Sequence, residues 1–171
     1  MNEDLKWYAL FVATGEEDRV KERIHFIMKA EIKALVPKRK MKERKEGIWK
    51  ERIRPLFPGY VLLNGQISSR AYNLITGIPG VIRFLKDSAG PQEIYKHEIW
   101  FISKLLSEGD IVGYSNIYIK GGKIEVTDGP LYGLEGLIQS VDRRKGRVKV
   151  LVDLMGQPRT VELCVTMIQP A

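Results

Sequence analysis

The chain has 171 residues, of which 44% are hydrophobic and 29% are charged, so it can form one average domain or two small ones and is not disordered throughout. Its net charge of +7 favours a polyanionic partner, with nucleic acid first. No uncharged apolar run approaches the roughly 18 residues of a membrane span, and no secretory signal is visible, so we expect a cytoplasmic protein that does not cross a membrane. The single cysteine, Cys164, excludes an internal disulfide and a cysteine-based metal site, and two histidines are too few for a zinc site.

Strand patterns recur in the first part of the chain. A continuous apolar run at 7–13 has a length suited to a buried strand. Further strands are expected at 32–36, 57–63 and 81–85, and the segment 86–92 is expected to be a loop.

Three helices are expected between and after these strands. Thr14 and Glu17 fit a capping box ahead of an amphipathic helix. Ser68 and Ser69 can cap a second helix. Its inward residues are expected to be Ala71, Leu74 and Ile75, and the third helix follows from the spacing of Tyr95, Ile99, Ile102 and Leu106. The order of the elements predicts an α+β fold, with an antiparallel sheet and helices packed mainly on one face.

Most of the positive charge lies in one segment of this first part. Residues 38–54 hold nine basic side chains against three acidic ones, a surplus of six in a chain of net charge +7. Gly47 lies near the middle, which predicts a β-hairpin with a basic tip. A solvated loop that only keeps the protein soluble is the alternative.

The pattern changes after residue 108. Glycine and polar residues at 109–119 predict a linker. From residue 120 onward, short β-rich runs are separated by turn sequences every 8 to 12 residues, which predicts a small barrel. The segment 143–150 is typical of a turn entering a strand, with Arg147 and Lys149 on one face and valines on the other.

Both parts of the chain carry motifs of a recognisable kind. The first part carries Lys6-Trp7-Tyr8, Leu56-Phe57-Pro58-Gly59-Tyr60-Val61 and Ile78-Pro79-Gly80-Val81. The second part carries Val126-Thr127-Asp128-Gly129-Pro130-Leu131-Tyr132-Gly133-Leu134-Glu135-Gly136-Leu137-Ile138. Together these motifs resemble the NusG family of transcription elongation factors. The resemblance implies an NGN domain over 1–108, a linker over 109–119 and a KOW domain, a small β-barrel, over 120–171.

The resemblance also implies that the NGN domain binds the clamp helices of RNA polymerase. Tyr8, Phe57, Pro58 and Tyr60 are expected to form a shallow aromatic face for this contact, whereas Trp7 is expected to lie in the core. Ser68 and Ser69 match the place where relatives touch the opposite side of the polymerase cleft.

The basic residues suggest a specialised relative. With its basic hairpin and its basic barrel, the chain resembles the LoaP group of NusG paralogs. Proteins of that group are antiterminators of particular operons and bind RNA hairpins. We therefore expect the barrel to bind a hairpin in the nascent leader transcript, and arginine is the better candidate for base recognition because its planar fork can bind a base edge. The candidate RNA-binding residues in the barrel are Arg143, Arg144, Lys145, Arg147, Lys149 and Arg159. Those in the basic hairpin are Lys38, Arg39, Lys40, Lys42 and Arg44.

Other functions stay open at this point. A general NusG-type factor would couple polymerase to a ribosomal protein or a termination factor through the loop at 154–159, where Met155 replaces a common aromatic residue. A basic structural RNA-binding protein is a second alternative. An enzyme is not expected, nor is a cofactor or metal, and the protein is expected to be a monomer. His25 and His97 are expected at the surface, and Cys164 is expected to pack in a strand.

Overall fold

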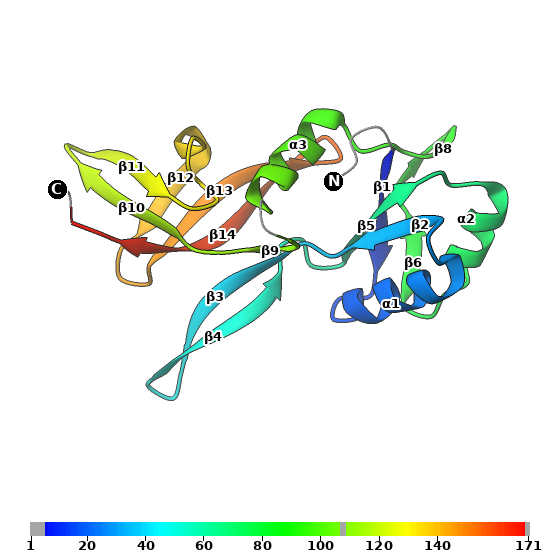
Figure 1. The fold of residues 1–171 in the computed structure, drawn as a ribbon, viewed down its shortest axis with the longest axis horizontal. Helices are drawn as coiled ribbons and strands as arrows, with labels where there is room; N and C mark the ends of the chain where they lie inside the picture. Colours follow the sequence, from blue (N-terminus) through cyan, green and yellow to red (C-terminus); the bar gives the residue numbers. More distant parts are fainter. Residues whose placement is uncertain (1–5, 107–108, 170–171) are drawn as a thin grey trace. The chain divides into compact units, whose positions relative to one another are not determined.

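The computed structural model describes residues 6–106 and 109–169, which fall into two compact units (Figure 1). The first unit comprises the described residues of 1–37 and of 57–99, and the second comprises those of 38–56 and 100–171. The basic hairpin thus belongs to the same unit as the C-terminal strands. The division into an NGN domain, a linker and a KOW domain stays a prediction.

A four-stranded antiparallel sheet forms the centre of the first unit. Its strands are β2 (Ile32–Leu35), β5 (Tyr60–Gly65), β1 (Trp7–Val12) and β6 (Val81–Phe84), in that order. The predicted strand at 57–63 starts later, because the chain first makes a turn in which Gly59 has a φ of 85°. Two short strands, β7 (Lys86–Asp87) and β8 (Gly90–Pro91), pair within the segment expected to be a loop.

Helices α1 (Glu17–Met28) and α2 (Ser69–Thr76) cover one face of this sheet, as predicted. Their apolar residues form one buried cluster with every second residue of the strands, on the face that the helices cover. The cluster includes Val20, Ile24, Met28, Ala71 and Ile75 from the helices and Leu10, Val12, Val61, Leu63 and Phe84 from the strands. Leu74, which was expected to face inward, is 36% exposed, so that prediction was wrong. Helix α3 spans Lys96–Leu105.

The start of α1 differs from the predicted capping box. The cap position is Glu16, and no capping side-chain hydrogen bond is found there among the described residues. Glu17 is instead buried, and its carboxylate accepts hydrogen bonds from Gly15 N at 2.9 Å and Gly59 N at 2.8 Å. The local pattern predicted the helix and a contact of this glutamate at its own helix start, but it did not show that the same carboxylate also binds a turn 42 residues away.

The second unit contains a five-stranded sheet that curls into a half-barrel, which confirms the predicted barrel-like fold. Its order is β11-β10-β14-β13-β12; within this sheet β10 and β14 pair in parallel, and the other neighbouring strands pair antiparallel. The bounds are β10 Ser115–Lys120, β11 Lys123–Asp128, β12 Ile138–Asp142, β13 Arg147–Leu154 and β14 Gln157–Met167, with a short 3-10 helix at Glu135–Leu137. Val148, Val150 and Val152 are buried, as the alternation predicted.

The segment 109–119 contains strands rather than only a linker. Strand β9 (Ile111–Val112) pairs in parallel with β3, and β10 begins at Ser115. Backbone pairing of β9 was not visible in the sequence because the strand has only two residues.

The basic hairpin is present as predicted, formed by β3 (Lys38–Lys45) and β4 (Ile48–Pro55). Lys45 pairs with Ile48, so Glu46 and Gly47 alone form the turn, with φ angles of 53° and 79°. Two successive positive φ angles are typical of the tight turn that suits the twist of a hairpin.

None of the described helices is long and apolar enough to cross a membrane.

His25 has a structural partner that the sequence did not reveal. Its Nε2 accepts a hydrogen bond of 3.0 Å from Ala34 N in β2, so the ring is neutral at this nitrogen. Burial, with contributions from Lys21 and Lys33, lowers the pKa of His25 below its ordinary value of 6.5. The expectation of a simple surface histidine was therefore wrong.

This contact predicts acid sensitivity. Because the folded-state pKa of His25 lies below that of the unfolded chain, the unfolded state binds more protons as the pH falls through the ordinary histidine range, and folding is destabilised there. We expect the melting temperature to fall between about pH 7 and about pH 5, and to fall less in His25→Gln. His97→Gln, at an exposed position, is the control. Equal acid sensitivity in His25→Gln and the unaltered protein would contradict the assignment.

Candidate functional site

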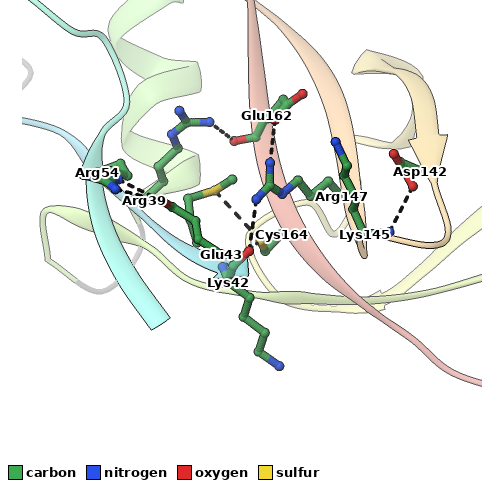
Figure 2. Close-up of polar contacts among 10 residues, drawn as sticks. Arg39, Lys42, Glu43, Arg54, Asp142, Lys145, Arg147, Glu162 and Cys164 are labelled. Atoms are coloured by element: carbon green, nitrogen blue, oxygen red, sulfur yellow. Dashed lines mark hydrogen bonds and ion pairs between the residues drawn. The ribbon is translucent and has the colours of Figure 1, made fainter. Parts of the chain in front are cut away.

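The two basic segments of the sequence meet in the second unit. Arg147, on β13, donates a hydrogen bond of 3.0 Å from Nη2 to the carbonyl oxygen of Lys42, on β3. Its Nη1 lies 3.3 Å from Glu162 Oε2, on the neighbouring strand β14. Figure 2 shows Arg147 between the hairpin and the sheet. One guanidinium thus joins three strands.

A second arginine reinforces this junction. Arg39 donates a hydrogen bond to the carbonyl oxygen of Glu162, and burial lowers the pKa of Arg39, although Glu162 counters part of this effect. Lys42 N donates to Cys164 Sγ at 3.3 Å, and Met41 Sδ lies 3.9 Å from the same sulfur. Met41 and Cys164 are both buried, which confirms the packing role predicted for the cysteine.

Arg39 and Arg147 were predicted to contact RNA. The structure shows both guanidiniums donating to protein acceptors, which leaves fewer of their N–H groups for a ligand. The sequence could not show that the hairpin and the sheet meet, because Glu162 is 123 residues from Arg39 and Lys42 is 105 residues from Arg147. Their contribution to RNA binding stays a prediction, and their observed contacts fix the hairpin on the sheet.

The other predicted cations are more accessible. The turn between β12 and β13 presents Arg143, Arg144 and Lys145, all exposed. Asp142 Oδ1 accepts from Lys145 N at 2.9 Å and so holds the turn (Figure 2). Of the other predicted RNA-binding residues, Lys42, Arg44 and Lys149 are exposed, and Lys38, Lys40 and Arg159 are half-buried.

A hollow of about 550 Å³ lies where the hairpin meets this turn. Its lining comprises Lys42, Trp49, Lys50 and Glu51 from the hairpin, Arg143, Arg144, Lys145 and Gly146 from the turn, and Val165, Thr166 and Met167 from β14. Trp49 was not among the predicted site residues. The available signal was a tryptophan placed among cations, an arrangement typical of sites that stack nucleic-acid bases.

Tyr114 holds Glu51, the one acidic residue in the lining of the hollow, in place. Tyr114 Oη donates a hydrogen bond of 2.7 Å to Glu51 Oε1. Burial, followed by this hydrogen bond, raises the pKa of Tyr114, so the phenol keeps its proton and stays a donor. Lys42 Nζ lies 5.1 Å from the centre of the Tyr114 ring, a distance suited to a cation–π contact.

The residues of the aromatic face predicted in the first unit differ in their exposure. Trp7 and Tyr8 are neighbours in β1, so their side chains point to opposite faces of the sheet. Trp7 is buried, as expected, and Tyr8 packs against the helix-covered core while staying partly exposed.

Phe57 and Tyr60 also differ from the prediction of exposed rings. Phe57 is 3% exposed, and Tyr60 is 9% exposed with its ring edge-on to Phe11 at 5.3 Å. The large apolar area of these rings favours burial once the turn at Gly59 points them inward. Pro58 between them remains exposed.

The two serines predicted to lie near polymerase are both exposed. Ser68 caps α2, since its Oγ accepts a hydrogen bond of 3.1 Å from Ala71 N.

No group of three or more His, Cys, Asp or Glu residues within 6–106 and 109–169 could hold a metal ion. The accessible side chains at the hollow are mainly cationic and aromatic.

Comparison with known proteins identifies the family. Residues 5–103 match the family model described as "Transcription termination factor nusG", which covers more than half of the chain. The chain belongs to the NusG family. The matched NusG region includes the Pro58 turn and the basic hairpin, and it ends before the cationic turn at 143–145.

Curated NusG proteins match over most of the chain. The Rickettsia prowazekii "Transcription termination/antitermination protein NusG" is 30% identical over 165 residues, covering 92% of this chain and 86% of its own length. The Haemophilus influenzae protein of the same name is 30% identical over 166 residues, covering 92% and 90%. The solved structure titled "Domain interaction in Thermotoga maritima NusG" is 24% identical, covers 94% of this chain and 93% of that chain, and has a TM-score of 0.61, which shows a common fold.

Proposed function

We propose that this NusG-type factor binds transcribing RNA polymerase through its first unit and a structured leader RNA through the cations of its second unit. Binding to the leader would recruit the factor to particular operons and make elongation there resistant to termination. The observation that supports this proposal is the meeting of two cationic segments, 38–54 and 143–149, in one compact unit.

The polymerase contact is assigned to the exposed residues around the Pro58 turn. Pro58, Ser68 and Ser69 are exposed and Tyr8 is partly exposed, so these residues can reach a partner, whereas Phe57 and Tyr60 support the turn from beneath. NusG-family factors bind RNA polymerase, and the sequence motif of this turn lies within the family match.

The RNA contact is assigned first to Arg143, Arg144 and Lys145. Each phosphate contact to single-stranded RNA releases counterions and contributes about −0.7 to the slope of log affinity against log salt. Specific recognition requires shape or unpaired bases, because side chains cannot read the narrow major groove of an RNA helix.

A transcription assay tests the proposal. RNA polymerase transcribes templates with a leader hairpin and a downstream terminator, with the full-length factor present. Replacing Arg143, Arg144 and Lys145 by alanine should abolish most leader-dependent readthrough, whereas Lys120→Ala, an exposed cation outside the hollow, should have little effect. Unchanged readthrough in the triple variant would refute the RNA assignment.

A general NusG-type role is the second candidate, since the relatives are named for both termination and antitermination. Met155 lies in the turn between β13 and β14 and has a φ of 55°. In a general factor, this loop is the one expected to bind a ribosomal protein or a termination factor. A factor of this kind would act equally on templates with and without the leader, so the same assay separates the two roles.

A further inference from the structure

The hollow between the hairpin and the β12–β13 turn is lined mainly by cationic side chains. Its lining carries five cationic side chains against one carboxylate, that of Glu51. This carboxylate already accepts a hydrogen bond of 2.7 Å from the Tyr114 hydroxyl. The local field in the hollow therefore favours an anion.

One wall of the hollow is aromatic. Trp49 is 48% exposed although it is a large apolar residue, and it comes from the hairpin, whereas Arg143, Arg144 and Lys145 come from the turn. Base stacking on an exposed aromatic ring tolerates any base, because every base has a π face.

The two walls are held together before any ligand binds. Arg147 and Arg39 join the hairpin to β14, and the Lys42 amide is bound to the buried Cys164 sulfur. The Lys42 side chain points away from these bonds (Figure 2). Prior positioning of both walls reduces the entropy that a ligand would otherwise lose on binding.

We propose that this hollow binds one unpaired nucleotide of an RNA, with its base stacked on Trp49 and its phosphates bound by Arg143, Arg144 and Lys145. The volume of about 550 Å³ lies within the range of pockets that take small ligands. This inference rests on the proposed RNA binding and deepens it: the basic hairpin and the half-barrel form one site, and the site selects a loop or bulge rather than a stem.

The choice of an unpaired nucleotide follows from the ring. A base inside a duplex is stacked on its neighbours and cannot stack on Trp49 without being extruded, at the cost of its pairing and stacking. An acidic peptide would satisfy the cations but would not need an exposed indole. The ring and the cations together therefore favour RNA with unstacked bases.

Binding measurements on the full chain test the inference. The probes are a stem-loop RNA with an unpaired uridine loop and a blunt duplex of the same stem, followed by fluorescence anisotropy at two salt concentrations. Trp49→Ala should weaken stem-loop binding about tenfold, as expected for the loss of one stacked base, and should leave duplex binding unchanged. Trp49→Phe should retain most of the affinity.

Trp49→Lys separates stacking from charge. This variant removes the ring and adds a cation, so the stacking site predicts weaker stem-loop binding, whereas a purely electrostatic surface predicts tighter binding. Tyr132→Ala is the matched control, because Tyr132 is an aromatic residue of the same unit, 68% exposed and outside the hollow. The far-ultraviolet dichroism of each variant establishes that it is folded.

The outcomes also separate this inference from the proposed function. If Trp49→Lys binds the stem-loop as tightly as the unaltered protein while the Arg143, Arg144 and Lys145 alanine variant loses it, the stacking site is refuted and the RNA role survives. If the triple variant keeps full affinity for the stem-loop, both are refuted.

Discussion

Gly129→Ala should destabilise the full chain by about 4 kcal/mol, as the sum of backbone strain and a steric clash. Gly129 has a φ of +99°, a conformation that residues with a side chain rarely adopt. A Cβ atom at this position would lie 2.6 Å from Ser115 Cα and 2.7 Å from Tyr114 O. Both neighbours are backbone atoms, so no flexible side chain can move aside to relieve the clash.

The position matters because the turn at Gly129 is tied to β10. Ser115 is 1% exposed, and its Oγ accepts a hydrogen bond of 3.0 Å from Leu131 N, two residues beyond Gly129. Displacing this turn breaks that buried hydrogen bond. Tyr114, whose carbonyl would also be displaced, donates to Glu51 in the lining of the hollow.

Gly133→Ala provides the matched control. Gly133 also has a positive φ, of +77°, but a Cβ atom there has nothing within 4 Å. The control therefore carries backbone strain alone, about 1 kcal/mol. Urea unfolding followed by far-ultraviolet dichroism measures both losses in stability. Equal losses in the two variants would contradict the clash at Gly129.

Local patterns predicted most of the elements. The apolar run at 7–13 gave β1, the alternation after residue 147 gave the buried valines of β13, and Ser68 caps α2 as expected. The basic hairpin followed from Gly47 between two charged runs. These features are set by residues close together in the chain, where periodicity and turn residues decide the structure.

Long-range contacts account for what the sequence did not predict. Phe57 is buried because of the turn at Gly59, and that turn depends on a carboxylate 42 residues earlier. Strand β9 exists through its pairing with β3, since two residues alone carry no pattern. No local pattern shows that distant segments will contact each other.

The candidate site shows the same difference between local patterns, which the sequence reveals, and long-range contacts, which it does not. Both cationic segments were visible in the sequence, and the arginines among them were assigned to RNA by residue type. The structure separates them by role: Arg39 and Arg147 donate to acceptors on β14 and β3, whereas Arg143 and Arg144 are exposed at the hollow. Trp49 gains its candidate role only because the turn at 143–145 lies across from it.

Glu17→Ala should cost about 3 kcal/mol of stability, because it removes two hydrogen bonds to a buried carboxylate and leaves a buried amide without its acceptor. Glu17 is 4% exposed and accepts from Gly15 N and Gly59 N. Gly59 lies between Pro58 and Tyr60, so the loss should be accompanied by disorder in the turn assigned to polymerase binding. Hydrogen exchange at the Gly59 amide measures this local effect, and urea unfolding measures the global one.

Two further variants distinguish the hydrogen bonds from the loss of a charge near the helix start. Glu17→Gln keeps one acceptor oxygen, so it should retain about half of the stability that alanine loses. Glu22→Ala removes an exposed carboxylate from the same helix and should change stability by no more than about 0.5 kcal/mol. If Glu17→Gln were as unstable as Glu17→Ala, the negative charge rather than the acceptor geometry would hold the turn. If Glu17→Ala matched Glu22→Ala, the carboxylate would contribute nothing there, and the buried position of Phe57 would have to depend on packing alone.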